Sequence, residues 1–231
     1  MELTPDDQPS GVAGLAPEDA ALPPVARKYG RVMDLSGLLP GDLILTRPVG
    51  EAAKSKFSKK IVSAQERAFS HSHAQWTHSA VYLGDRENIC EANVFVPRKR
   101  WGVIVRPIQE YADGKHAIKA RRPAGLSDLE RLRVVIGALT NLKKDYDFLY
   151  LITLANDLFF GRKVWDPSAG KIRIRSNAVV CSTLYADAFT YGCQKAITRN
   201  GNLCVPAKLS ESHLFDDDVP LSWLTLPDQS H

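Results

Sequence analysis

Long apolar runs and export signals are missing from this sequence. The longest stretch rich in apolar residues, FLYLITLANDLFFG, is interrupted by Asn156 and Asp157, whereas a membrane-spanning helix needs about 20 consecutive apolar residues. The first residues, MELTPDDQPSGVAGLAPEDAALPP, are acidic and broken by prolines, and they lack the positive start and apolar segment of a secretory signal. We therefore expect a chain without a transmembrane segment that is cytoplasmic as synthesised.

Cysteine is scarce, and the charge is only mildly positive. The four cysteines form no CxxC pair and have no histidine at zinc-finger spacing, so free thiols are expected and no structural metal. The net charge of +4 is far from the dense positive stripe of a nucleic-acid-binding protein. We expect no nucleic-acid partner and no cofactor, whereas an anionic partner remains open.

Internal repeats and low-complexity arrays are also absent. With 231 residues, 44% of them hydrophobic, the chain is long enough for one ordinary core. Residues 1–30 are rich in Pro, Ala, Asp and Gly without periodicity, which predicts a flexible N-terminal leader. Residues 31–231 are expected to form a single, monomeric domain, with residues 205–231 closing over it as an irregular tail.

Turn residues divide the first half of the chain into short strand-like runs. Pro40-Gly41 predicts a turn before a strand at residues 42–46, and Gly84-Asp85 predicts a hairpin turn between residues 78–83 and 89–95. The other strand-like runs are residues 101–108 and 116–123. These runs suit an antiparallel sheet.

Helical patterns are mostly found after the strands. Ser127 and Glu130 have capping-box spacing and open a helix over residues 127–145. One face of that helix carries Leu129, Leu132, Ile136 and Leu139. Other helical segments are residues 51–73, as one basic amphipathic helix or two short ones, and residues 148–160. A last helix carries Cys181 at its start or within its first turns, depending on whether Ser176, Asn177 or a later residue caps it, and ends near Gly192. This order indicates an α+β domain, with an antiparallel sheet packed on one side by helices that include the cysteine helix.

Cys181 lies where a short aliphatic run passes into that last helix. A cysteine on an apolar helix face is usually a small buried hydrophobe. A helix N-terminus, however, lowers the pKa of a thiol, and its unpaired backbone N–H groups suit the stabilisation of an oxyanion. Cys181 is therefore either a packing residue or a nucleophile, depending on whether a base lies nearby.

His78, the first residue of the predicted hairpin, is the candidate base. Strand alternation puts His78 on one face with Ala80 and Tyr82. A hairpin register with an odd pairing sum brings Glu91 or Asn93 to the same side, where either residue could orient the imidazole by a hydrogen bond. The residues alone leave these two possibilities open. They also leave open a binding module without catalysis, with a metal site at His71, His73 and His78.

Five motifs occur in an order that resembles a known family. LLPGDLILTRP, THSAVYLGD, ICEAN, YDFLY and VVCSTLYADAF are similar to the motifs of the circularly permuted papain-like hydrolases, within the NlpC-related cysteine peptidases of the YaeF/YiiX type. The resemblance implies a permuted papain-like fold in which the histidine precedes the cysteine along the chain. It implies Cys181 as nucleophile, His78 as general base and acid, and Glu91 as the orienting residue. Tyr146 and Asn93 are the expected substrate contacts.

The same resemblance implies a thiol amidase or endopeptidase that cleaves an amide bond, with bacterial peptidoglycan peptides as the expected substrate. Such an enzyme either recycles wall fragments in the cytosol or is a toxic effector. An effector would be exported by a specialised machine such as a type VI secretion apparatus, would act in a target periplasm, and would require an immunity protein.

The alternative enzyme is a lipid acyl hydrolase or acyltransferase similar to the lecithin:retinol acyltransferase-like group. Two residues depart from that pattern. Val180 stands where the group has an asparagine before the nucleophile, and Glu91 stands where it has a second histidine. These departures favour the amidase.

Overall fold

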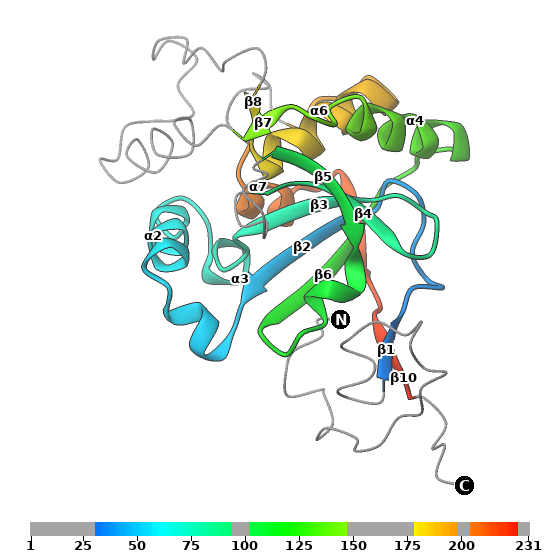
Figure 1. Ribbon diagram of the computed structural model, residues 1–231. Coiled ribbons are helices and arrows are strands. Elements are labelled where there is room, and N and C mark those ends of the chain that lie inside the picture. The colour runs from blue at the N-terminus through cyan, green and yellow to red at the C-terminus, as the bar shows by residue number, and fades with distance from the viewer. Residues whose placement is uncertain (1–30, 94–101, 147–177, 198–203, 226–231) are drawn as a thin grey trace, which may run out of the picture.

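The five predicted strands, joined by one that was not predicted, β9, form one antiparallel sheet of six strands in the order β5–β4–β3–β2–β6–β9. The computed structural model describes residues 31–93, 102–146, 178–197 and 204–225. The sheet (Figure 1) consists of β2 (Leu43–Pro48), β3 (His78–Tyr82), β4 (Asn88–Asn93), β5 (Gly102–Pro107), β6 (His116–Pro123) and β9 (Phe215–Val219). The expected α+β class with a mostly antiparallel sheet is confirmed.

The β3–β4 hairpin forms with the odd register. Val81 pairs with Cys90 and Tyr82 with Ile89. The turn requires glycine, because Gly84 has a φ of 85° and a Cβ atom there would lie 2.4 Å from Pro40 Cγ. Pairing between the two strands is confined to these residues, and the rest of β4 pairs with β5 alone. The strands therefore separate toward the start of β3.

Two helices cover one face of the sheet. α4 (Asp128–Leu139) begins at Ser127, whose N–H donates to Glu130 Oε2 at 2.8 Å in the predicted capping box. α6 (Cys181–Cys193) runs antiparallel to it, because Gly192 meets Val134 while Gly137 meets Ala188 (Figure 1). A Cβ atom on Gly192 would lie 2.4 Å from Val134 Cγ2, so the helices pack closely.

The apolar stripe of α4 faces outward. Leu129, Leu132 and Ile136, which share the predicted face, are 58%, 50% and 49% exposed. The face that packs against α6 and the sheet is made of smaller residues, such as Val134 and Ala138. The helix was predicted correctly, but its largest aliphatic side chains are not the ones that bury it.

The two faces of the sheet carry separate cores. On the α6 side, Leu43, Leu45, Val81 and Cys90 pack with Leu184, Tyr185 and Phe189. On the other side, Ile44, Ala80, Tyr82 and Ile89 pack with side chains from β1 (Arg31–Asp34) and from the 3-10 helix η4 (Ile108–Tyr111). Each strand thus alternates between two buried environments.

The prediction of an irregular C-terminal tail is wrong for residues 204–225. They form α7 (Pro206–Glu211), β9 at the edge of the main sheet, and β10 (Ser222–Thr225), which pairs with β1. Arg121 fixes this segment by donating to the carbonyl oxygens of Ser210 at 2.7 Å and Ser212 at 3.0 Å. Three consecutive aspartates are poor strand formers, yet an edge strand tolerates charge.

The remaining elements are short. They are η3 (Gly50–Lys54), α2 (Lys56–Gln65), α3 (His71–Ala74) and the parallel pair β7 (Asp145–Tyr146) and β8 (Ala178–Val179). The leader and the predicted helix at 148–160 lie outside the described residues. Among the described residues, no helix combines the length and apolarity needed to cross a membrane.

Candidate active site

Cys181 is the first residue of α6, immediately after an extended segment. Val180 is the N-cap, with extended φ and ψ of −105° and 163°. Its N–H donates to Thr183 Oγ1 at 3.1 Å. The N–H groups of Cys181, Ser182 and Thr183 find no partner among the described residues, as expected for the first turn of a helix. They place positive partial charge beside the thiol.

His78 and Cys181 meet although they come from opposite sides of the sheet. α6 packs on the face of β3 that carries Val81, whereas alternation directs His78 to the other face. Beside His78, at the start of β3, no pairing with β4 is recorded. The Cys181 thiol and the His78 imidazole are close enough to interact electrostatically, because His78 lowers the pKa of Cys181 and Cys181 raises that of His78.

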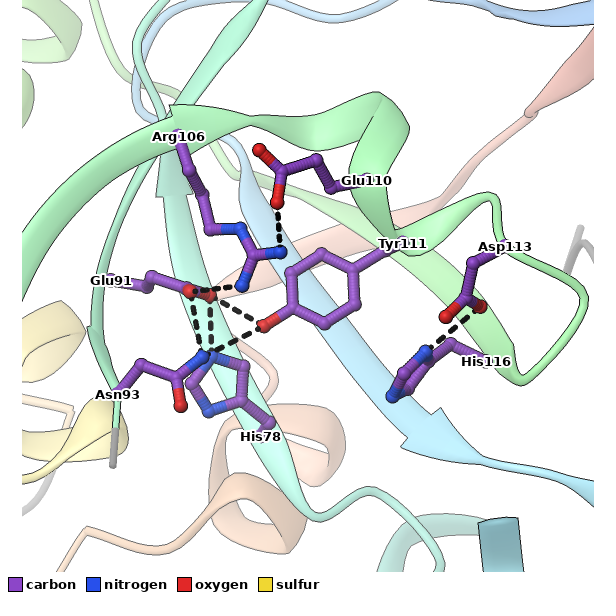
Figure 2. Close-up of polar contacts among 8 residues, drawn as sticks. All are labelled: His78, Glu91, Asn93, Arg106, Glu110, Tyr111, Asp113 and His116. Carbon is purple, nitrogen blue, oxygen red and sulfur yellow. Dashed lines mark hydrogen bonds and ion pairs between the residues drawn. The ribbon is translucent and has the colours of Figure 1, made fainter. Parts of the chain in front are cut away.

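Glu91 is the third member of this group. Its Oε2 atom lies 2.7 Å from His78 Nε2, as Figure 2 shows. Because Nε2 is occupied by the carboxylate, Nδ1 is the ring nitrogen that remains for the thiol. Asn93, the other residue that the sequence left open, donates instead to Glu91 Oε1 at 2.8 Å. Asn93 therefore supports Glu91 in this structure.

Two further residues hold Glu91, and sequence reasoning missed both. The Tyr111 hydroxyl donates to Oε2 at 2.7 Å, and Arg106 Nη1 donates to Oε1 at 3.4 Å. The Arg106 guanidinium also lies over the Tyr111 ring, 5.0 Å from its centroid (Figure 2). Each carboxylate oxygen thus receives two donors, which fixes its orientation toward His78.

The buried charges stabilise one another. Burial opposes ionisation of Glu91, but the charge of His78 and hydrogen bonds from His78, Asn93 and Tyr111 outweigh it and lower the pKa of Glu91 to about 2. Burial likewise opposes the imidazolium, but the charges of Glu91 and Cys181 raise the pKa of His78 to about 10. The site therefore favours a carboxylate and an imidazolium at neutral pH.

Cys181 differs from the other three cysteines in the direction of its pKa shift. Burial opposes its thiolate, but the charge of the neighbouring His78 outweighs burial and lowers its pKa. For the others, burial dominates. It raises the pKa of Cys90 to about 12 and also raises the pKa values of Cys193 and Cys204. Only an ionised thiol is a strong nucleophile.

The three histidines considered as a metal site have separate partners. His71 Nδ1 lies 2.8 Å from Glu66 Oε1, and His73 Nδ1 lies 2.9 Å from Ser210 Oγ, while His78 contacts Glu91. Within the described ranges, no group of three or more His, Cys, Asp or Glu residues could hold a metal ion. The three histidines therefore belong to three separate sets of contacts.

The backbone of Tyr146 lies close to Cys181. β7 pairs with β8 so that Tyr146 lies opposite Val179, two residues before Cys181. Its side chain lies outside what the structure describes, so its expected contact with substrate stays a prediction.

Comparison with known proteins does not identify the chemistry of this site. No family model and no curated protein matches the chain. The ordered motifs and the arrangement of Cys181, His78 and Glu91 are therefore the grounds on which a function is assigned.

Proposed function

We propose that the protein is a cysteine hydrolase with a Cys181–His78–Glu91 triad on a circularly permuted papain-like fold. The observation that carries this proposal is the hydrogen bond between Glu91 and His78, together with the electrostatic interaction of His78 with Cys181 at a helix N-terminus. His78 is 17% exposed in its side chain, whereas Glu91 is fully buried. The base is thus open to substrate while its orienting carboxylate is shielded from water.

The chemistry would be acyl transfer. The Cys181 thiolate attacks a carbonyl carbon, and the electron pair moves to the carbonyl oxygen, where the free N–H groups of α6 stabilise the oxyanion. The tetrahedral intermediate collapses as His78 protonates the leaving group, which leaves a thioester on Cys181. His78 then takes a proton from water, the hydroxide attacks the thioester, and the carboxylic acid product and Cys181 are released.

The substrate class we favour is an amide in bacterial peptidoglycan peptides. Support comes from the five ordered motifs and from Glu91 in the third position of the triad. The enzyme would recycle wall peptides in the cytosol or, if exported by a specialised secretion apparatus such as type VI, cleave them in a target periplasm. In the second case a producing cell would need an immunity protein.

A lipid acyl group is the second candidate, and one observation favours it. Leu129, Leu132 and Ile136 present large apolar side chains to solvent on α4. Because the two helices are antiparallel, Leu129 and Leu132 lie toward the Cys193 end of α6, and Ile136, in the C-terminal half of α4, is the one of the three that lies nearest the Cys181 end. An enzyme that works at a lipid surface needs apolar contact near its nucleophile.

A product analysis tests both candidates. We expect the wild-type protein, incubated with purified peptidoglycan and separately with phospholipid vesicles, to release new peptide amines and carboxylates from peptidoglycan, measured by mass spectrometry. Cys181→Ala is expected to lower the rate by more than about 10³-fold, with a change in unfolding free energy of about 1 kcal/mol or less.

Cys193→Ala is the matched control, because Cys193 is also a buried residue of α6 but its thiol pKa is raised. Its rate should equal that of the wild type. Full activity in Cys181→Ala would remove the nucleophile assignment, and release of fatty acid alone would transfer the proposal to the lipid candidate.

A further inference from the structure

We propose that Arg106 is a positioning residue of the site, which shares Glu91 with His78 and so limits how firmly the histidine holds its proton. The surface residue Glu110 sets the extent of that sharing, because it binds the same guanidinium. This inference rests on the proposed function, because it concerns the acid strength of the same histidine.

Glu91 lies between two cationic side chains. Its Oε2 atom lies 2.7 Å from His78 Nε2, and its Oε1 atom accepts from Arg106 Nη1 at 3.4 Å, as Figure 2 shows. The Glu91 side chain is fully buried, so solvent ions screen these charges little. A carboxylate that a second cation also contacts supports the first cation less, because the two positive charges oppose each other.

The β5 strand places Arg106 where it can act on Glu91. Arg106 lies opposite Ile89 in the register, and alternation puts Ile89 and Glu91 on the same face of β4. The guanidinium also lies over the Tyr111 ring, 5.0 Å from its centroid. Burial opposes the charge of the guanidinium, but the charge of Glu91 outweighs burial and raises the pKa of Arg106. Arg106 therefore stays a cation while His78 titrates.

Glu110 binds the other nitrogen of the same guanidinium. Its Oε2 atom accepts from Arg106 Nη2 (Figure 2), and its side chain is 48% exposed. The distance of 3.4 Å from Nη1 to Glu91 is longer than the roughly 2.7–2.9 Å of a strong bond between charged groups. The guanidinium is thus divided between a surface carboxylate and a buried one, and Glu91 is only partly neutralised.

The charges that face His78 decide how readily it donates a proton. Burial opposes the imidazolium, but Glu91 of β4 and Cys181 of α6 raise the pKa of His78 to about 10. Tyr111 of η4 is a neutral donor to Glu91, so Arg106 is the cation that opposes the imidazolium. An acid whose pKa lies far above the working pH protonates a leaving group poorly. Arg106 therefore keeps His78 closer to the acid strength that the proposed reaction needs.

The test is an NMR titration of His78 in the full chain with isotope-labelled histidine, in which the ring signal is assigned by its loss in His78→Asn. We expect Arg106→Gln to move the midpoint of His78 to higher pH by about half a unit, which is about threefold in proton affinity. Glu110→Gln should move the midpoint to lower pH, because Arg106 can then pair with Glu91 alone.

Three further variants make the result specific. In the double variant Arg106→Gln with Glu110→Gln, the midpoint should equal that of Arg106→Gln, because Glu110 acts through the guanidinium. Arg106→Lys keeps the positive charge and should return most of the shift. Arg86→Gln removes an exposed positive charge from the β3–β4 turn, and its midpoint should equal that of the wild type.

The possible failures are distinguishable. A wild-type midpoint in the ordinary range of a histidine would overturn the ion pair with Glu91 and, with it, the proposed function. A high wild-type midpoint that Arg106→Gln leaves unmoved or lowers would overturn only the inference about Arg106. A shift by Glu110→Gln that persists in the double variant would do the same. If Arg106→Gln does not fold, Glu110→Gln alters an exposed side chain, and an unmoved midpoint there overturns the inference.

Discussion

Two carboxylates in the described part of the chain are fully buried, yet they are held in different ways. Asp42, at the entry to β2, accepts from Arg122 Nη2 at 2.8 Å and from Arg131 Nη1 at 3.3 Å. Glu91, in β4, accepts from His78 and Tyr111 at 2.7 Å each. Arginine stays charged at every accessible pH, whereas histidine gains and loses a proton near neutrality.

The different partners suit different functions. Asp42 anchors a helix to the sheet, whereas Glu91 belongs to the proposed reactive site. Arg131 belongs to α4, so its ion pair with Asp42 ties that helix to the sheet. Glu91 instead faces a titratable ring that also interacts with a thiol. Burial is equal for the two carboxylates and so does not distinguish a functional carboxylate from a structural one. Glu91 is distinguished by its partner, His78, which can transfer a proton.

The largest expected contrast comes from converting each carboxylate to its amide. Glu91→Gln should slow hydrolysis by about 10²-fold or more, because the imidazolium loses the charge that supports it. Asp42→Asn should lower the free energy of unfolding by about 3 kcal/mol, because the buried Arg131 and the partly buried Arg122 lose their counter-charge. Rates measured on the folded fraction and urea denaturation give the two effects.

Crossed controls complete that experiment. The alkylation rate of Cys181 in folded Asp42→Asn should match the wild type, and Glu91→Gln should be destabilised less than Asp42→Asn, because Arg106 keeps its contact with Glu110. Equal loss of Cys181 reactivity in both variants would end the distinction between anchor and site.

Acid titration should show an effect of intermediate size. The pKa of Glu91 is lowered from 4.5 to about 2 in the folded protein, so its ionised form adds stability above pH 4.5 that is lost as the pH falls through about 2. A shift of this size corresponds to on the order of 3 kcal/mol. Wild-type unfolding free energy should fall over this window, and Glu91→Gln should lack that part of the slope.

A measurement of unfolding at pH 5, 4, 3 and 2 is sufficient. Asp42→Asn retains Glu91 and should keep the slope. If the unfolding free energy of Glu91→Gln fell with pH as steeply as that of the wild type, other carboxyl groups would account for the loss of stability in acid.

The smallest contrast removes one hydroxyl from each region. Tyr111→Phe deletes the donor to Glu91 and should lower kcat about tenfold with KM unchanged, since a hydrogen bond to a charged group contributes about 1.5–3 kcal/mol. Tyr185→Phe deletes a buried hydroxyl that donates to Gly41 O, next to Asp42, at 2.7 Å. It should cost about 1 kcal/mol of stability and leave kcat unchanged. A similar fall in kcat for both variants would make Tyr111 merely structural.

The β3–β4 hairpin, and the side of the sheet on which His78 meets its partner, could be predicted because they depend on residues close together in the sequence. Strand alternation and a short turn set the register, and the register brings both Glu91 and Asn93 to the side of His78. The choice of Glu91 came from the resemblance to a known family. Tyr111 and Arg106 could not be found in this way, because they come 20 and 15 residues after Glu91. Their approach depends on how β5 and η4 return across the sheet.

Two other features, the orientation of α4 and the strand β9, were predicted wrongly because they depend on tertiary contacts. Helical spacing on α4 predicted the helix but not its orientation, because close packing against α6 selects Gly137 and Val134 over the larger leucines. The β9 strand is acidic, and its place at the edge is fixed by contacts between the preceding segment and Arg121. Neither contact is visible in local sequence.

The pairing of β1 with β10 places Arg31 opposite Thr225. A short linker between these residues would therefore join the two ends without disturbing the main sheet. New ends could then be opened at the surface turn around Gly125, where an added Cβ would meet nothing within 4 Å, between β6 and α4. In such a chain Cys181 would be synthesised before His78, although every strand pairing would be preserved. The order of the two along the chain is thus set by where the backbone is cut, while their meeting is set by the sheet.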